Sequence, residues 1–187
     1  LSGNGHDGTI IGDINWNDDS LSFNGTTNAV NLGRIDLQNI TMEIVVLDES
    51  TDSQKKSTYI SNFENGGAGI EKQQKIYMSA FINSGYTLIY AKDNFVANKK
   101  VSLSGSYSSN KMKLYQLGVL QQENSTTGSF KMPESNTVMM IGANPSRTLP
   151  NSDYLKGKVY SVRIYNKALS DEEIKQNYTV DKVRFGL

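Results

Sequence analysis

The chain has 187 residues, of which 37% are hydrophobic, and this length fits one domain spanning residues 1–187 with a substantial buried core. Its 19 Lys and Arg balance its 19 Asp and Glu, so no net charge favours nucleic acid or an anionic membrane as a partner. Cysteine is absent and no apolar run approaches the length of a membrane span, which argues against a disulfide framework, thiolate metal sites and a transmembrane helix.

The first part of the chain predicts a β-hairpin. Residues 21–23 and 30–32 alternate apolar with polar side chains. The Asn24-Gly25 pair that follows the first run is typical of a tight hairpin turn. We therefore expect these two runs to pair with each other.

The segment GDINWNDDS, residues 12–20, is rich in side-chain oxygens of the kind that Ca²⁺ takes. It does not fit an EF-hand loop, because Asp18 stands at the required glycine position and Asn24 stands where a bidentate Glu should be. A solvated turn is the favoured interpretation, and no metal site is expected. Trp16, the only tryptophan, is interpreted first as a residue that packs this loop onto the domain and second as a platform for a sugar.

Several later runs predict strands. Every second side chain from Ile40 to Val46 is apolar and the opposite face is partly apolar as well, so residues 39–48 are expected to form a central strand. Residues 99–104 and 111–117 are expected to pair as a hairpin across SGSYSSN. Further strands are expected at residues 57–63, 75–82, 86–91 and 137–142, a Gly-rich turn at 64–70, and long loops at 49–56 and 143–154.

The stretch 156–165 is β-branched and aromatic and predicts another strand. Val162 and Ile164 share one side of this strand by the two-residue period. Val159 is out of phase with them, so burial of all three residues requires a β-bulge.

A helix is expected directly afterwards, over residues 170–178. Ser170 and Glu173 have the spacing of a capping box, and Leu169 is placed to pack on Ile174. No other segment has a comparable helix start signal. With about a dozen short strands elsewhere, the sequence predicts an all-β fold, a two-sheet antiparallel β-sandwich with one short C-terminal helix.

Three motifs stand out in chain order. They are the opening SGNGHDGTI followed by LSFNGTTNAVNL, the middle SSNKMKLYQLGVL, and the closing GKVYSVRIYNKALSDEEI at residues 157–174. Together they resemble the laminin-G-like domains of the concanavalin A-like lectin/glucanase superfamily, over nearly the whole chain. The resemblance implies the jelly-roll form of the sandwich. It also implies a bacterial or phage-associated member, whose relatives serve as recognition modules.

The chain departs from this family where acidic residues often follow the G-x-V motif, because Tyr160 and Ser161 stand there. An acidic residue also often precedes the opening Ser-Gly-Asn, where this sequence begins. A structural calcium associated with those acids therefore lacks part of its ligand set, and no cofactor is expected. Because the sequence begins inside a turn motif, we expect a domain of a longer protein, whose other domains are its partners.

Catalytic residues are not expected. A retaining glucanase needs two carboxylates on one strand face, whereas Glu43 and Asp48 are separated by an odd number of residues and point to opposite faces. His6 is the only histidine and is interpreted as a turn-packing residue, so no Ser-His-Asp triad or His-rich zinc site is available. We therefore predict that the protein is not an enzyme.

Tyrosines and polar loop residues provide the candidate binding surface. Aromatic rings stack on the apolar faces of sugars, while amides, acids and guanidinium groups bond to sugar hydroxyls. For any one tyrosine, an ordinary place in a strand is the simpler interpretation. The tyrosines expected off the core face or next to loops are Tyr59, Tyr77, Tyr86, Tyr90 and Tyr154. The expected ligand-binding residues are Asn62, Glu64, Asn65, Tyr77, Tyr86, Tyr90, Asn144, Arg147, Asp153 and Tyr154.

Arg147 is the first choice for an anchor, because its fixed fork of donors can read sugar hydroxyls or the carboxylate of an acidic glycan. A solvated loop charge is an equal alternative. Residues 143–154 and the turn at 64–70 are expected at one end of the domain. If the site is elsewhere, the tyrosines of the concave sheet face, Tyr77, Tyr86 and Tyr90, are the next candidates.

The sequence is thus interpreted as a noncatalytic recognition domain whose partner is a carbohydrate or cell-surface glycan, and neither nucleic acid nor a membrane. Its expected place is extracellular, on a cell surface or on a virion, for example in a phage tail. The alternative is a structural or protein-interaction module, a spacer or oligomerisation unit that binds no sugar. An aromatic and polar patch at one end favours the first, and a flat apolar patch on a sheet face favours the second.

Overall fold

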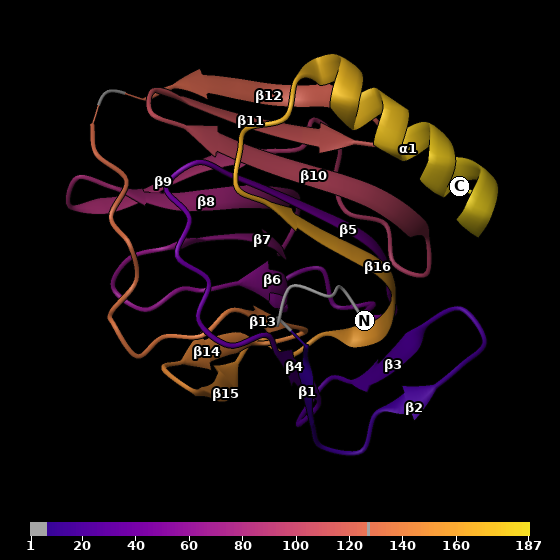
Figure 1. Ribbon diagram of the computed structural model, residues 1–187. Coiled ribbons are helices and arrows are strands. Elements are labelled where there is room, and N and C mark those ends of the chain that lie inside the picture. Colours follow the sequence, from indigo (N-terminus) through magenta and orange to yellow (C-terminus); the bar gives the residue numbers. More distant parts are fainter. Residues whose placement is uncertain (1–6, 127) are drawn as a thin grey trace.

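The computed structural model describes residues 7–126 and 128–187, and in these residues it contains sixteen strands and one helix (Figure 1). In chain order the elements are β1 (Thr9–Ile11), β2 (Asn15–Trp16), β3 (Leu21–Asn24), β4 (Ala29–Asn31), β5 (Ile40–Asp48), β6 (Ser57–Ser61), β7 (Ala68–Lys72), β8 (Ile76–Ile82), β9 (Gly85–Tyr90), β10 (Lys100–Ser108), β11 (Lys111–Gln116), β12 (Val119–Ser125), β13 (Met140–Ile141), β14 (Asn144–Ser146), β15 (Leu149–Ser152), β16 (Lys156–Tyr165) and α1 (Asp171–Phe185). Two seven-stranded sheets form a sandwich, and β14 and β15 form a separate hairpin.

The core lies between the two sheets. The first sheet has the order β1-β4-β13-β6-β7-β8-β9, and the second has the order β12-β11-β10-β5-β16-β3-β2. Ile44 of the second sheet and Ile70 and Met78 of the first are almost wholly buried in one cluster. The sheets come so close at Gly105 that a Cβ atom there would lie 3.0 Å from the Met78 sulfur. This arrangement confirms the predicted sandwich and defines which strand faces look outward.

Strand β5 is central, as predicted, because it pairs with β10 on one side and with β16 on the other. The predicted bulge in β16 is also confirmed, since the register shifts between Val159 and Ser161. This shift lets Val159, Val162 and Ile164 all pack against the core despite their odd spacing.

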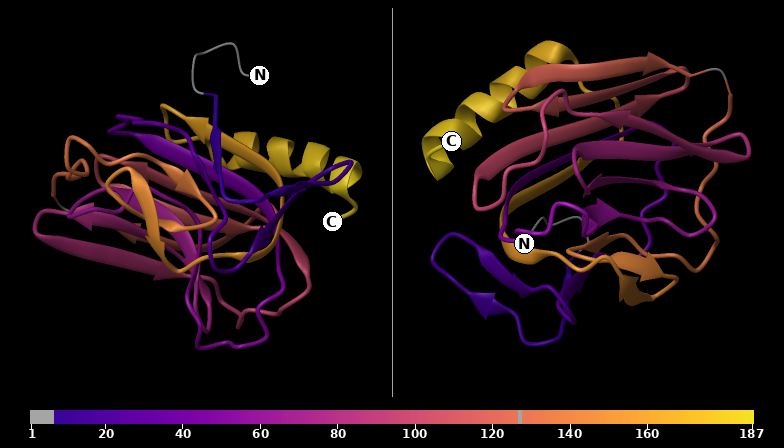
Figure 2. Two further views of the ribbon diagram at one scale, coloured as in Figure 1. Left: turned by 90° about the horizontal axis from the view of Figure 1, so that it is seen from below. Right: turned by 180° about the vertical axis from the view of Figure 1, so that it is seen from behind.

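The predicted hairpin between residues 21–23 and 30–32 is wrong. Strand β3 pairs with β16 and β2 in the second sheet, whereas β4 pairs with β1 and β13 in the first. The Asn24 side chain accepts hydrogen bonds from the amides of Thr26 and Thr27, so Asn24-Gly25 shapes a crossing between the sheets. Strand β3 instead forms a hairpin with β2, which projects from the sandwich in Figure 1 and in the right view of Figure 2.

The pairing of β10 with β11 confirms the other predicted hairpin, although its strands extend to Ser108 and Lys111 and leave only two residues in the turn. Residues 143–154 were predicted as a loop, which is wrong, because they contain the β14–β15 hairpin. Pro145 stands opposite Pro150, next to a register irregularity, a position where a strand tolerates proline.

The loop 49–56 is held in place by a buried lysine. The Lys72 ammonium group donates to the carbonyl oxygens of Asp52, at 3.2 Å, and Lys55, at 2.9 Å. It also lies 4.6 Å from the centroid of the Phe95 ring. Burial lowers the pKa of Lys72, and the charge of Asp48 opposes this effect. This loop is therefore fixed by the fold.

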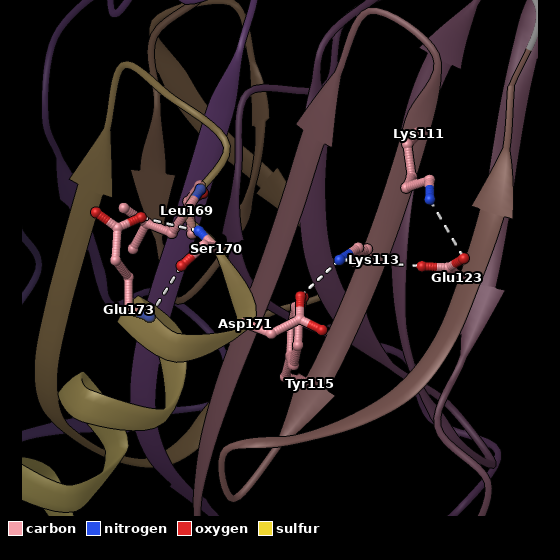
Figure 3. A network of polar contacts seen from close by, with 9 residues as sticks. Lys111, Lys113, Tyr115, Glu123, Leu169, Ser170, Asp171 and Glu173 are labelled. Carbon is pink, nitrogen blue, oxygen red and sulfur yellow. Dashed lines mark hydrogen bonds and ion pairs between the residues drawn. The ribbon is translucent and has the colours of Figure 1, made fainter.

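Helix α1 lies on the outer face of the second sheet (Figures 1 and 2). The predicted capping box is present, because the Ser170 hydroxyl accepts from the Glu173 amide and the Glu173 carboxylate accepts from the Ser170 amide (Figure 3). Leu169 and Ile174 pack in one cluster with Tyr115. Asp171 adds hydrogen bonds from Lys113 and Tyr115, which join the helix start to β11 (Figure 3).

The helix is longer than predicted, since it ends at Phe185 and not at Tyr178. Its last turns carry Asp181, whose buried carboxylate accepts two hydrogen bonds from Arg163 of β16. Such tertiary contacts are absent from the local sequence pattern, and they stabilise a segment with weak helix signals. No helix among the described residues has both the length and the apolar content needed to cross a membrane.

Candidate functional site

A groove of about 480 Å³ lies on the outer face of the first sheet. Because Ile70, Met78 and Ile89 point into the core, their neighbours on β7, β8 and β9 point outward into the groove. The turn after β6 and the β14–β15 hairpin complete it. The groove is lined by Lys56, Phe63, Glu64, Asn65, Glu71, Tyr77, Ser79, Tyr86, Leu88, Asn144, Pro145 and Asn151.

Tyr86 is the exposed aromatic ring of the groove. Its hydroxyl donates to the Gly66 carbonyl oxygen over 2.9 Å. Its ring meets Phe63 and Phe81 edge-on, with centroids 5.3 Å and 4.9 Å away. Tyr86 is nevertheless 42% exposed. Three contacts thus hold the ring in one orientation while leaving part of it open to a ligand.

Tyr77 brings a second aromatic group to the groove. Its ring centroid lies 5.6 Å from that of Tyr90, which is itself exposed but does not line the groove. Burial raises the pKa of Tyr77, and the negative charge of Glu71 raises it further. The phenol is therefore neutral at ordinary pH.

An ion-pair cluster adjoins these rings. Lys56 Nζ lies 2.8 Å from a carboxylate oxygen of Glu71 and 3.5 Å from one of Asp153. The Thr58 hydroxyl donates to the same Glu71 oxygen over 2.9 Å. Burial raises the pKa of Glu71, while Lys56 and Thr58 act in the opposite direction. Four polar residues thus form one connected group beside the groove.

Asn144 lines the groove, and its side chain carries a buried acceptor without a partner in the described part of the chain. Its side-chain oxygen Oδ1 is buried and has no hydrogen-bond partner among the described residues. Leaving such an atom unpaired costs about 1–3 kcal/mol.

Five of the predicted binding residues meet in the groove. Residues 64–65 of the turn and Asn144 of the hairpin lie with the sheet-face tyrosines Tyr77 and Tyr86. The expected loop site and the expected sheet-face site are therefore one site. Asp153 lies at the edge of the groove, where it contacts the lining residue Lys56.

The other predicted residues lie elsewhere. Arg147, at the tip of the β14–β15 hairpin, is 3.6 Å from Glu134 and does not line the groove. Asn62 is buried and accepts the Ala68 amide, so it shapes the turn. Tyr154 packs on the small cluster around Val138.

The expectation that Tyr59 lies off the core face is wrong. Tyr59 is wholly buried, and its hydroxyl donates to Asp48 over 3.1 Å. The register of β6 shifts between Thr58 and Ile60, which reverses the alternation on which the expectation depended.

Groove residues that sequence reasoning missed include Lys56, Phe63, Glu71, Ser79 and Leu88. The alternation in 75–82 already places Tyr77 and Ser79 on one side, which was a usable signal. Glu71 and Lys56 gave none, because their pairing depends on how β6 and β7 align.

Trp16 does not pack its loop onto the domain, so the first interpretation of this residue is wrong. It is 73% exposed on the projecting β2–β3 hairpin. It borders a separate cavity of about 370 Å³ with Tyr160 and Arg184. The hairpin is instead anchored by residues such as Phe23.

The two strand carboxylates lie away from the groove and on opposite faces of β5, as predicted. Glu43 faces the helix, where it contacts Arg163 at 3.6 Å and accepts from Asn177 at 2.9 Å. Asp48 faces the core and accepts from Tyr59. Burial raises the pKa of both groups. Within residues 7–126 and 128–187, no three His, Asp or Glu side chains gather as a metal-ion site, and His6 lies outside these residues.

The fold is a jelly-roll sandwich with a groove on the outer face of one sheet. A family model described as the concanavalin A-like lectin/glucanases superfamily matches residues 12–175. The chain therefore belongs to the concanavalin A-like lectin/glucanase superfamily, which confirms the resemblance seen in the sequence. No curated protein sequence matches the chain.

Solved structures share this fold. Domain 4 of AbnA, an extracellular GH43 arabinanase from Geobacillus stearothermophilus, in complex with arabinotriose, has a TM-score of 0.74 at 16% identity, with 94% of this chain and 90% of that chain covered. The receptor-binding domain of botulinum neurotoxin C/D mosaic serotype has a TM-score of 0.76 at 15% identity, with 96% and 48% covered. The chain thus spans about half the length of the neurotoxin domain.

Proposed function

We propose that this protein is a noncatalytic carbohydrate-binding domain and that the groove on the first sheet is its ligand site. The observation that carries the proposal is the fixed and partly open ring of Tyr86 beside a set of polar groups. A sugar has an apolar C–H face for such a ring and hydroxyls for the polar groups around it.

The polar groups near Tyr86 suit sugar hydroxyls. Asn65, in the turn after β6, and Asn151, in the β14–β15 hairpin, are exposed amides, and Asn144 lines the groove as well. Amides both donate and accept, as hydroxyls do. The size of the groove suits a short oligosaccharide, because small-molecule sites commonly measure about 300–1,000 Å³.

The arrangement of acids supports binding without hydrolysis. Glycoside hydrolysis uses two carboxyl groups that flank the scissile bond. Of the two carboxylates that line the groove, Glu71 is committed to Lys56 and Thr58, which leaves Glu64 without a second free carboxylate. Glu43 and Asp48 do not line the groove. Incubation with β-glucans, arabinan and galactan should release no reducing ends, and release that is abolished by Glu71→Gln or Glu43→Gln would contradict this part of the proposal.

The proposed setting is an extracellular one, in a secreted, cell-surface or virion protein such as a phage tail component. Two proteins with this fold offer parallels: AbnA is extracellular and its domain 4 was solved with arabinotriose, and the neurotoxin domain is a receptor-binding domain. Other domains of a longer protein would then supply catalysis, anchoring or assembly.

A second candidate function is protein interaction through the helix. Val180 and Val183 of α1 are 57% and 84% exposed, which is unusual for apolar side chains on neighbouring turns. Sedimentation of the wild type and of Val183→Glu would test self-association. A dimer that is lost in the variant would support this candidate.

The test of the proposed function is a glycan array, run with and without a chelator, followed by titration of the best ligand. We expect micromolar to millimolar binding that does not depend on the chelator. Absence of binding to every glycan on the array would contradict the proposal.

A further inference from the structure

The charges in the groove are strongly unequal. Lys56 is the only cationic residue among the residues that line it, and Glu64 and Glu71 line it too. Asp153 approaches the same ammonium group from the edge. One ammonium group thus faces three carboxylates, although the chain as a whole has a formal net charge of zero.

The ammonium group of Lys56 already forms ion pairs within the protein. Its two carboxylate neighbours, Glu71 at 2.8 Å and Asp153 at 3.5 Å, come from different elements of the fold. Burial by itself lowers the pKa of Lys56, but the charges of Glu71 and Asp153 bring it above its ordinary value. Glu71 is only 2% exposed and is held by Thr58 as well, so it cannot swing away.

Two other cationic residues, Arg147 and Lys131, do not offer a charge to the groove. Arg147 pairs with Glu134. Lys131 lies over the Phe81 ring, 5.0 Å from its centroid. Neither residue lines the groove.

These charges decide which ligands fit. A ligand carboxylate placed here would meet Glu71 and Asp153 without a free cation to balance it, and like charges brought together out of bulk water repel strongly. A neutral sugar pays no such cost, because its hydroxyls can donate to the carboxylates and can bond to the exposed amides of Asn65 and Asn151. The earlier expectation that Arg147 reads an acidic glycan is therefore not supported by this geometry.

We propose that the groove selects uncharged oligosaccharides over acidic ones, and that Glu71 and Asp153 set this selection by holding Lys56. The inference rests on the proposed carbohydrate-binding function and adds the class of ligand. Glu71 and Asp153 act here as specificity-determining residues through Lys56.

The experiment uses a glycan array in which neutral backbones are paired with their uronate or sialylated counterparts, followed by calorimetric titration of the best pair. The wild type should bind the acidic member at least about tenfold more weakly than the neutral one. In the double variant Glu71→Gln/Asp153→Asn, Lys56 is released from its ion pairs, and the difference in affinity should narrow to within about threefold. The gain in affinity for the acidic glycan should fall as the salt concentration is raised.

Glu134→Gln is the matched control, because it releases Arg147 outside the groove and should leave the preference unchanged. If the double variant does not fold, Asp153→Asn alone should still narrow the difference, since Asp153 is at the partly exposed edge. Equal or tighter binding of the acidic member by the wild type would overturn the inference and leave the proposed function standing. If the folded variants keep the wild-type preference for neutral glycans, Glu71 and Asp153 do not determine the specificity. If the wild type binds no glycan at all, the proposed function itself is contradicted.

Discussion

The Tyr86 hydroxyl donates to the Gly66 carbonyl oxygen over 2.9 Å, and this bond ties the exposed ring of β9 to the turn between β6 and β7. It belongs to the same end of the first sheet as the edge contacts with Phe63 and Phe81. A ring held in this way loses little conformational entropy when a ligand stacks on it.

Tyr86→Ala is therefore expected to weaken glycan binding at least about tenfold, because burial of an aromatic face contributes about 1.5–3 kcal/mol. Tyr86→Phe keeps the ring and loses only the bond to Gly66, so a smaller loss of about threefold is expected. Titration calorimetry measures both, with melting curves to check folding. Trp16→Ala, which removes an exposed aromatic residue outside the groove, should bind as the wild type does.

Asn144→Ala separates a binding role from a structural one. Because Asn144 Oδ1 makes no hydrogen bond among the described residues, its removal breaks none and should lower the free energy of unfolding by less than about 1 kcal/mol. Glycan affinity should nevertheless fall about three- to tenfold. A variant that loses stability but keeps its affinity would show that this side chain serves the fold and not the ligand.

The helix start gives a stability prediction. Ser170→Ala should cost about 1 kcal/mol through the lost N-cap. Ile174→Ala should cost more, about 2–4 kcal/mol, because Ile174 is fully buried against Tyr115 and Leu169. Urea unfolding measures both, and an unchanged midpoint for Ile174→Ala would mean that the helix does not dock on the second sheet.

Asp48 gives a pH prediction. Burial raises the pKa of Asp48 above its ordinary value, despite the Ser50 amide and Lys72. The folded state therefore holds this proton more tightly than the unfolded state does. The contribution of Asp48 to stability is present at low pH and is lost as the pH rises through its folded pKa.

Asp48→Asn should remove this dependence. The difference in unfolding free energy between the variant and the wild type is expected to shift in favour of the wild type as the pH is lowered from 7 towards 4. Other groups that titrate, such as Asp171, cancel in this difference because both proteins contain them. A difference that stays constant over this range would contradict the raised pKa.

The sequence predicted those features that local patterns specify. The capping box at Ser170, the bulge at Val159 and the central place of β5 each follow from spacing within a few residues. The Asn24-Gly25 turn was misread, because the same dipeptide also suits a crossing between sheets. The last turns of α1 were missed, since Asp181 finds its partner on β16.

For the candidate site too, the sequence predicted what local patterns specify and missed what tertiary contacts specify. Outward alternation was enough to propose Tyr77 and Tyr86, and turn composition was enough to propose Glu64 and Asn65. The sequence did not place Lys56 beside Glu71, because that contact is set by the register of β6 and β7. Tyr59 was misplaced by a register shift in β6 for which its sequence gives no sign.

Amide chemical-shift mapping of the ¹⁵N-labelled protein, titrated with the best glycan from the array, most directly tests whether the groove is the ligand site. Trp16 is the only tryptophan, so its single indole N–H signal reports on the other exposed aromatic surface in the same spectrum. Binding in the groove should shift the signals of residues 63–65, 77–79, 86–88 and the Asn144 side chain, and leave the indole signal unchanged. Shifts confined to the Trp16 indole and the residues around Tyr160, with the groove signals unmoved, would contradict the assignment of the site.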